Sequence, residues 1–254
     1  MTKLLVSVRD VEEARIALES GVDLIDLKEP NRGALGAVTM EVAADAVRLR
    51  DATRDERNAT PLSMALGELV DFFPHDVSPN DCDIAAPYET IELPVGIRFF
   101  KVGLADCARR THWRDQLQHF VRRTIRRSGF VAVAYADHEA VDAPSFDEVL
   151  TEATRLEARV LLIDTAVKDG RTLLDHWDRE QLGNAVLKIG RRSMLSVIGG
   201  GLRAESFAAV ALCSPDYVAV RGAACVGGRA AKINAERIAA LRSLLPQPAA
   251  TASP

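Results

Sequence analysis

The segment LIDLK, residues 24–28, shows the pattern from which the fold follows. Its apolar residues alternate with Asp26 and Lys28, as in a strand that buries one face, and the turn-forming segment EPNRGALGA follows at once. Runs of this kind recur from end to end, with segments of helical spacing between them. The eight runs are LLVSV, LIDLK, PLSMALG, RFFKVGL, VAVAYAD, VLLIDTA, LSVIGG and YVAVRG.

Eight strand–helix units in 254 residues predict an α/β fold, a single-domain (β/α)8 TIM barrel. An open doubly wound sheet also alternates strands and helices, but the count and the length favour the barrel. We assign the barrel to residues 1–245 and a disordered tail to residues 246–254. The segment Glu68–Ile97 is expected to be a long loop with one short helix. The expected helices include Val11–Ser20, Met40–Arg50, Trp113–Arg127, Phe146–Glu157, Glu205–Leu212 and Ala235–Leu245.

Charge and composition argue against several classes of function. A net charge of −4 and a pI near 5.8 make a nucleic-acid or anionic-membrane partner an unexpected one. The N-terminal segment reaches a charge too early for a signal peptide, and no apolar stretch approaches about 20 residues, so we expect a cytoplasmic protein. Cysteine and histidine spacings fit no metal site, so we expect no dependence on a metal. Barrels often pair through outer helices, so a homo-oligomer is expected.

Lysine is scarce in this chain, with six lysines against twenty-six arginines. Three of the six, Lys28, Lys101 and Lys168, lie at or just beyond the end of a strand-like run. Only an amine can lose its proton near neutral pH and attack a carbonyl, whereas a guanidinium cannot. Lysines kept at these places therefore indicate amine chemistry, although a single strand-end lysine is more often half of a structural ion pair.

Strand geometry predicts that these lysines share one site. Side chains alternate between the two faces of a strand, so Asp26 and Lys28 point into the barrel while Ile25 and Leu27 pack outward. Inward groups at the C-terminal strand ends form the active sites of TIM barrels. Clustered lysines lower one another's pKa, and aspartates offset their charge. The same alternation sends inward Lys101, Tyr135, Asp137, Asp164 and Arg221.

Two loops predict a site for a phosphorylated small molecule. The segments 199–201 and 221–224 end the last two runs, where barrels bind phosphate through backbone N–H groups. Tight turns that merely require glycine are the alternative explanation. The loop at 29–37 brings a further arginine toward the same end of the barrel. The candidate substrate-binding residues are Gly200, Gly201, Arg221, Gly222, Ala223, Arg32 and Asp137.

Four longer segments carry a family resemblance: VSVRDVEEARIALESGVDLIDLKEPNRGALGA, FFKVGL, LLIDTAVKDGRTL and YVAVRGAACVGG. They are similar to the (5-formylfuran-3-yl)methyl phosphate synthase family of methanofuran biosynthesis. The resemblance implies a TIM-barrel lyase that condenses two glyceraldehyde 3-phosphate molecules with loss of phosphate and water, without a cofactor. By matching position it makes Lys28 the Schiff-base lysine and Lys101 the proton acceptor. It gives supporting roles to Asp26, Asp164 and Lys168.

The chain departs from that family after the third run, where a short loop with a lysine and a glycine is expected. Residues 69–96 are longer and contain no lysine, so no role is carried over there. A second phosphate would then need Arg32, Arg98, another arginine or a partner chain.

Three other functions remain open from the sequence. A class I aldolase would use Lys168 as its nucleophile. A phosphate-sugar decarboxylase would need Asp-x-Lys-x-x-Asp, whose last position here is Asn31. A non-catalytic sugar-phosphate-binding protein would keep the phosphate loops but would not need amines of lowered pKa.

Overall fold

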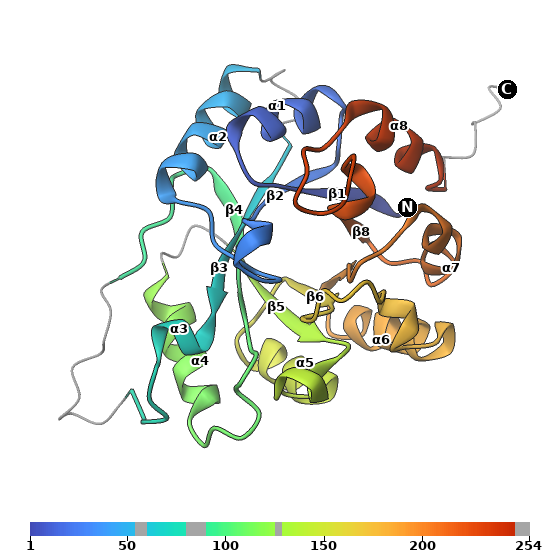
Figure 1. The fold of residues 1–254 in the computed structure, drawn as a ribbon. Coiled ribbons are helices and arrows are strands. Elements are labelled where there is room, and N and C mark those ends of the chain that lie inside the picture. The colour runs from blue at the N-terminus through green and yellow to red at the C-terminus, as the bar shows by residue number, and fades with distance from the viewer. Residues whose placement is uncertain (54–59, 80–89, 125–128, 247–254) are drawn as a thin grey trace, which may run out of the picture.

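The computed structural model describes residues 1–53, 60–79, 90–124 and 129–246. Within them the chain forms a closed barrel of eight parallel strands in sequence order, with β8 paired back to β1 (Figure 1). The TIM-barrel prediction is therefore confirmed. The strands are β1 (Lys3–Val8), β2 (Leu24–Leu27), β3 (Leu62–Glu68), β4 (Ile97–Gly103), β5 (Gly129–Tyr135), β6 (Val160–Asp164), β7 (Leu195–Ile198) and β8 (Tyr217–Val220).

Helices surround the barrel, and their ends follow local capping chemistry. Asp10, Ser145 and Asn234 each accept a backbone N–H in the first turn of the helix that follows them. The helices are α1 (Val11–Glu19), α2 (Met40–Ala52), α3 (Leu69–Phe72), α4 (Trp113–Arg123), α5 (Phe146–Arg155), α6 (Arg179–Gly190), α7 (Phe207–Ala211) and α8 (Ala235–Ser243). In the described part of the chain, no helix has both the length and the apolar character to cross a membrane.

Some expectations differ from the observed elements. The long segment after β3 does contain one short helix, α3, but residues 80–89 lie outside the described part. The predicted C-terminal tail also lies outside it, apart from Pro246. Helix α6 was not predicted, and Lys28, Asp137 and Arg221 stand one or two residues past their strands.

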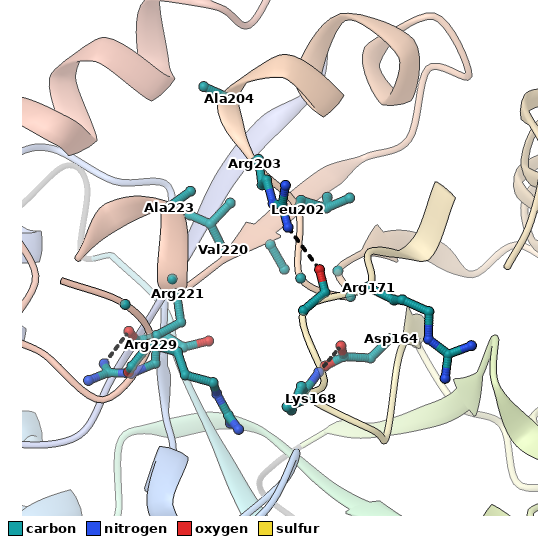
Figure 2. A pocket seen from close by; sticks show the side chains of 18 of the residues that line it. Asp164, Lys168, Arg171, Leu202, Arg203, Ala204, Val220, Arg221, Ala223 and Arg229 are labelled. Carbon is teal, nitrogen blue, oxygen red and sulfur yellow. Dashed lines mark hydrogen bonds and ion pairs between the residues drawn. The ribbon is translucent and has the colours of Figure 1, made fainter. Parts of the chain in front are cut away.

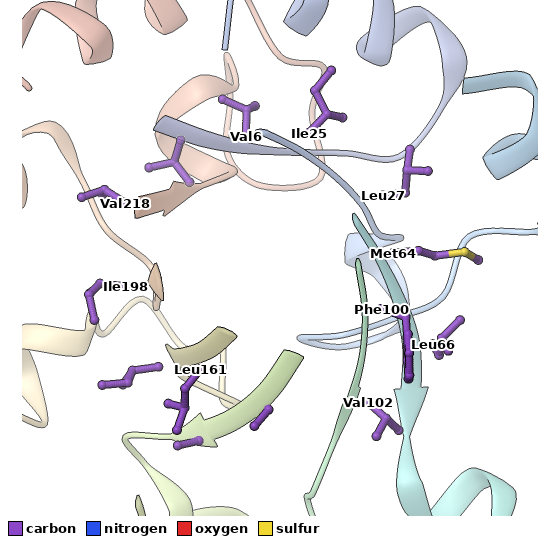
Figure 3. Packing of buried hydrophobic residues seen from close by; sticks show 14 of the residues in the cluster. Val6, Ile25, Leu27, Met64, Leu66, Phe100, Val102, Leu161, Ile198 and Val218 are labelled. Carbon is purple, nitrogen blue, oxygen red and sulfur yellow. The ribbon is translucent and has the colours of Figure 1, made fainter. Parts of the chain in front are cut away.

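The apolar core has two layers, as strand alternation requires. Ile25 and Leu27 point outward and pack with residues of the surrounding helices, and Figure 3 shows outward side chains from several strands. Each large aliphatic side chain buried in this way stabilises the fold by roughly 1.5–3 kcal/mol. A second cluster fills the barrel interior, with Leu5, Leu24 and Val133 among its members.

The loop after β2 covers one side of the barrel mouth. Leu35 is buried and packs with the interior cluster, together with Ala34 and Tyr135. The carbonyl of Leu35 accepts a hydrogen bond of 2.9 Å from the N–H of Gly67 at the end of β3. This contact closes the mouth over β3 and leaves the opening on the side of β6, β7 and β8.

Candidate active site

A pocket of about 580 Å³ opens at the C-terminal ends of the strands (Figure 2). Buried side chains of β1 and β6 and the residue after β2, Lys28, line its floor, and the loops after β6, β7 and β8 form its rim. This is the end of a TIM barrel at which active sites lie. Charged or polar side chains in the lining are Ser7, Lys28, Asp164, Lys168, Arg171, Arg203, Glu205, Arg221, Arg229 and Arg237.

Two of the predicted lysines meet one aspartate on the pocket floor. Asp164 is the last residue of β6, and its carboxylate lies 3.0 Å from Nζ of Lys168 and 3.9 Å from Nζ of Lys28. Lys168 also donates to the carbonyl and the hydroxyl of Thr165, at 2.5 and 3.2 Å. All three N–H bonds of the Lys168 ammonium are therefore used, whereas Lys28 has one longer ion pair within the described part of the chain.

The pKa values of this group follow from burial and charge. Burial lowers the pKa of Lys28 to about 8, although Asp164 and Asp26 act in the opposite direction. Burial by itself would raise the pKa of Asp164, but the cations of Lys168 and Lys28 outweigh it and lower that pKa to about 2. Near neutral pH the site therefore holds a carboxylate and a lysine with an appreciable amine fraction.

The third predicted lysine lies deeper in the barrel. Lys101 of β4 donates to the carboxylate of Asp26, and its side chain is only 4% exposed. Asp26 also accepts from the hydroxyls of Ser7, at 3.2 Å, and Ser63. Burial would raise the pKa of Asp26, but Lys101 and Lys28 lower it below its usual value, so Asp26 is a carboxylate. Lys101 does not line the open pocket, and Ser7 is the member of this network that does.

The turn after β7, which lines the pocket, requires glycine at two positions. Gly200 and Gly201 have φ angles of +91° and +63°, which disfavour other residues, and a Cβ at Gly201 would lie 2.8 Å from the carbonyl of Arg171. Both glycines line the pocket with Gly222 and Ala223. Their position fits the phosphate-binding place of TIM barrels.

Arginine side chains that the sequence analysis did not predict as site residues lie at the rim of the pocket. Within the described residues, Arg203, Arg229 and Arg237 have no carboxylate within 4.0 Å. Arg203 donates to the carbonyl of Gly170 at 2.8 Å, and Arg229 to that of Gly33 at 3.0 Å. Figure 2 shows Arg171, Arg203 and Arg229 on different sides of the hollow. Such a rim favours an anionic ligand.

The structure revises the predicted role of Arg221. Its buried guanidinium donates to Glu13 of α1 at 2.7 Å, to the carbonyl of Ser7 at 3.0 Å and to that of Arg229 at 2.7 Å. A guanidinium occupied in this way braces the barrel and the loop after β8, and it is not available to a phosphate. Sequence reasoning placed Arg221 at the mouth but had no means of pairing it with Glu13.

Asp137 and Arg32 are also placed differently from the prediction. The carboxylate of Asp137 accepts the backbone N–H groups of Ala166 and Val167, both at 2.8 Å, and so fixes the loop that carries Lys168. Arg32 is exposed at the end of a short 3-10 helix, Pro30–Arg32, and does not line the pocket. Neither residue lines the pocket.

A half-buried acid in the closed half of the mouth, Glu68, was missed. Glu68 accepts from the hydroxyl of Tyr135 at 2.7 Å and from the N–H of Ala105 at 3.0 Å. It lies across Gly103, where a Cβ would come within 2.0 Å of its carboxylate. Burial raises the pKa of Glu68, and burial together with Glu68 raises that of Tyr135. Among the described residues, no cluster of three or more His, Cys, Asp or Glu is placed to hold a metal.

Most of the chain matches one family of known proteins. The model of the 4-HFC-P synthase family matches residues 4–242. The chain is 31% identical over 246 residues to the (5-formylfuran-3-yl)methyl phosphate synthase of Methanothermobacter thermautotrophicus, across 95% of this chain and 98% of that protein. It is 33% identical over 236 residues to the enzyme of the same name from Methanopyrus kandleri, across 89% and 90%.

Solved structures share the fold at much lower identity. The 3-hexulose-6-phosphate synthase of Salmonella typhimurium superimposes with a TM-score of 0.55 at 14% identity, across 96% of this chain and all of that chain. The phosphoribosyl anthranilate isomerase of Thermus thermophilus gives 0.57 at 11% identity, across 96% and 98%. These likenesses concern the barrel alone.

Proposed function

This chain belongs to the 4-HFC-P synthase family, as its motifs predicted, and we propose that it is a lyase that makes (5-formylfuran-3-yl)methyl phosphate for methanofuran biosynthesis. In this reaction two glyceraldehyde 3-phosphate molecules condense with loss of phosphate and water. The observation that carries the proposal is Lys28, an amine with a pKa of about 8 on the floor of a pocket with a cationic rim.

Lys28 is the proposed nucleophile. Its Nζ adds to the aldehyde carbon, and loss of water from the carbinolamine gives an iminium ion. The iminium acidifies the neighbouring C–H, and the resulting enamine either expels phosphate from the next carbon or adds to the second aldehyde. Asp164, held between Lys28 and Lys168, balances the iminium charge, and the Lys168 ammonium is placed to protonate the departing hydroxyl.

The rest of the pocket suits two phosphorylated substrates. The backbone N–H groups near Gly200, Gly201 and Gly222 suit one phosphate. The guanidinium groups of Arg203 and Arg229 supply positive charge for a second, a role that the sequence had left open. Holding both substrates in one pocket raises their effective concentration.

Lys101 is proposed as the proton acceptor on the strength of the family resemblance. In this barrel it connects to the pocket through Asp26 and Ser7. Any proton that it takes up must therefore pass through this network or through water that enters from the pocket.

The second candidate is a class I aldolase with Lys168 as its nucleophile, because Lys168 lines the same pocket. The hydrogen bonds of Lys168 favour Lys28 instead, because the Nζ of Lys168 makes three contacts, with Asp164 and Thr165, that it would have to give up before it could attack a carbonyl.

Reductive trapping tests the proposal. The protein is incubated with glyceraldehyde 3-phosphate, reduced with borohydride, and digested so that the modified peptide can be identified by mass spectrometry. We expect the label on Lys28. A label on Lys168 would support the aldolase, and no label with any triose phosphate would exclude both imine mechanisms and leave a sugar-phosphate-binding protein.

A further inference from the structure

Two serines donate to Asp26, but only one of them faces the pocket. Ser7 of β1 and Ser63 of β3 stand opposite Asp26 in the strand register, one on each side. Both hydroxyls donate to its carboxylate. Ser7 lines the open pocket together with Lys28, whereas Ser63 lies in the barrel interior beside Lys101.

The hydrogen bond to Asp26 fixes what Ser7 offers to a ligand. A carboxylate only accepts hydrogen bonds, so the single hydroxyl proton of Ser7 is committed to Asp26. Its Oγ keeps lone pairs, and within the described residues no donor reaches that atom. Arg221 holds the position from behind, because it donates to the carbonyl of Ser7 at 3.0 Å and is itself paired with Glu13. Ser7 therefore presents a rigid hydrogen-bond acceptor to the pocket.

The register also relates this acceptor to the nucleophile. Ser7 pairs with Asp26, and Lys28 follows two residues later, with its N–H bonded to the carbonyl of Val8 at 2.9 Å. The Ser7 acceptor thus lies one step deeper in the barrel than the lysine, on the same pocket wall. From this position its Oγ can accept a hydrogen bond from a group on the substrate carbon next to the one that Lys28 attacks.

We propose that Ser7 forms a subsite for the hydroxyl group next to the reacting carbonyl, so that the pocket selects α-hydroxyaldehyde phosphates. The inference rests on the proposed function, since it takes the Lys28 imine as the reference point. A deoxy substrate would leave the buried Ser7 acceptor without a donor, and sites built to bond a hydroxyl reject analogues that lack it.

The experiment uses two ligands that cannot form an imine. Glycerol 3-phosphate and 3-hydroxypropyl phosphate have the same phosphate and terminal hydroxyl and differ only in the middle hydroxyl. Titration calorimetry of the wild type should show roughly tenfold or greater preference for glycerol 3-phosphate. In Ser7→Ala the preference should fall to about twofold or less, because the acceptor is gone. Ser63→Ala, the matched control, removes the other hydroxyl from Asp26 and should keep the wild-type preference.

The outcomes test the Ser7 subsite separately from the imine mechanism at Lys28. Equal affinities in the wild type, or an unchanged preference in Ser7→Ala, would overturn the subsite even if Lys28 is trapped by borohydride. Loss of the preference in both serine variants would assign it to Asp26 and also overturn the Ser7 proposal. A preference that depends on Ser7 with no trapped Lys28 would support the subsite and reject the imine mechanism.

Discussion

Two lysine–aspartate pairs lie in this barrel at different depths. Lys101 and Asp26 are in direct contact, and two serine hydroxyls complete the bonding of Asp26. Lys28 and Asp164 are 3.9 Å apart in the wall of an open pocket, where Asp164 is shared with Lys168. Lys101 and Asp26 thus belong to a closed hydrogen-bond network. Lys28 and Asp164 form a longer ion pair at an open pocket.

The difference explains why the pKa of Lys28 is lowered. Burial disfavours the ammonium form, and only a close counterion offsets this cost. Lys28 is buried while its counterion is distant and divided, so burial prevails and its pKa falls to about 8. Lys28 therefore differs from Lys101 in two ways: it lies farther from its carboxylate, and it lines the open pocket.

Replacement of Lys28 should have the largest effect on activity. Lys28→Arg keeps a cation beside Asp164 but cannot form an imine, so product formation should fall at least about 10⁴-fold. Furan product is measured by chromatography, and circular dichroism checks that the fold is retained. Substantial residual product in a folded variant would refute the nucleophile assignment.

The deep and the shallow lysine–aspartate pairs should contribute differently to the stability of the fold. Lys101→Met leaves the carboxylate of Asp26 buried without its cation, and we expect a loss of about 3–5 kcal/mol in the free energy of unfolding. Lys168→Met leaves Asp164 with a second cation, Lys28, and should lower it by less, about 1–2 kcal/mol. Urea denaturation compares the two variants. Equal losses would show that the two sites do not differ in this way.

Acid stability should reveal the pairing of Asp164. Its pKa of about 2 lies below the ordinary 3.8, so its pairing stabilises the fold above about pH 4 and this contribution is lost as the pH falls toward 2. The contribution is about 2 kcal/mol. The difference in unfolding free energy between wild type and Asp164→Asn should therefore shrink over this range. Asp169→Asn, at the surface beside Arg171, is the control: the hydrogen bond from Arg171 also lowers the pKa of Asp169, but solvent screens this exposed pair, so the difference should shrink much less.

The smallest effect concerns the pH dependence of labelling. With a pKa of about 8, Lys28 should react with a carbonyl reagent roughly ten times faster at pH 9 than at pH 7, because the amine fraction rises. Asp164 raises this pKa, so Asp164→Asn should move the midpoint lower. Peptide mass spectrometry gives the rate at Lys28. A midpoint that stays near 10.5 would contradict the lowered pKa.

Hydrophobic periodicity and strand alternation were enough to predict the barrel and several residues that point into it. Alternation in LIDLK placed Ile25 and Leu27 outside and Asp26 inside, and the structure agrees. Helix α6 was missed, although Asp178 and Gln181 form a capping box that marks its start. Ser7 was also missed, although it is a polar residue on the inward face of an apolar strand, the same signal that identified Asp26.

The sequence by itself determined the eight strands, the inward aspartates and the lysines near the strand ends, because side-chain alternation and hydrophobic periodicity are local properties. Only the tertiary structure decided that Lys28 faces an open pocket while Lys101 lies in a closed ion pair. It also decided that Arg221 serves Glu13, a partner 208 residues away along the chain. Depth, ion-pair partners and access depend on how strands stagger and which loops cover them, and these relations exist only once the barrel has closed.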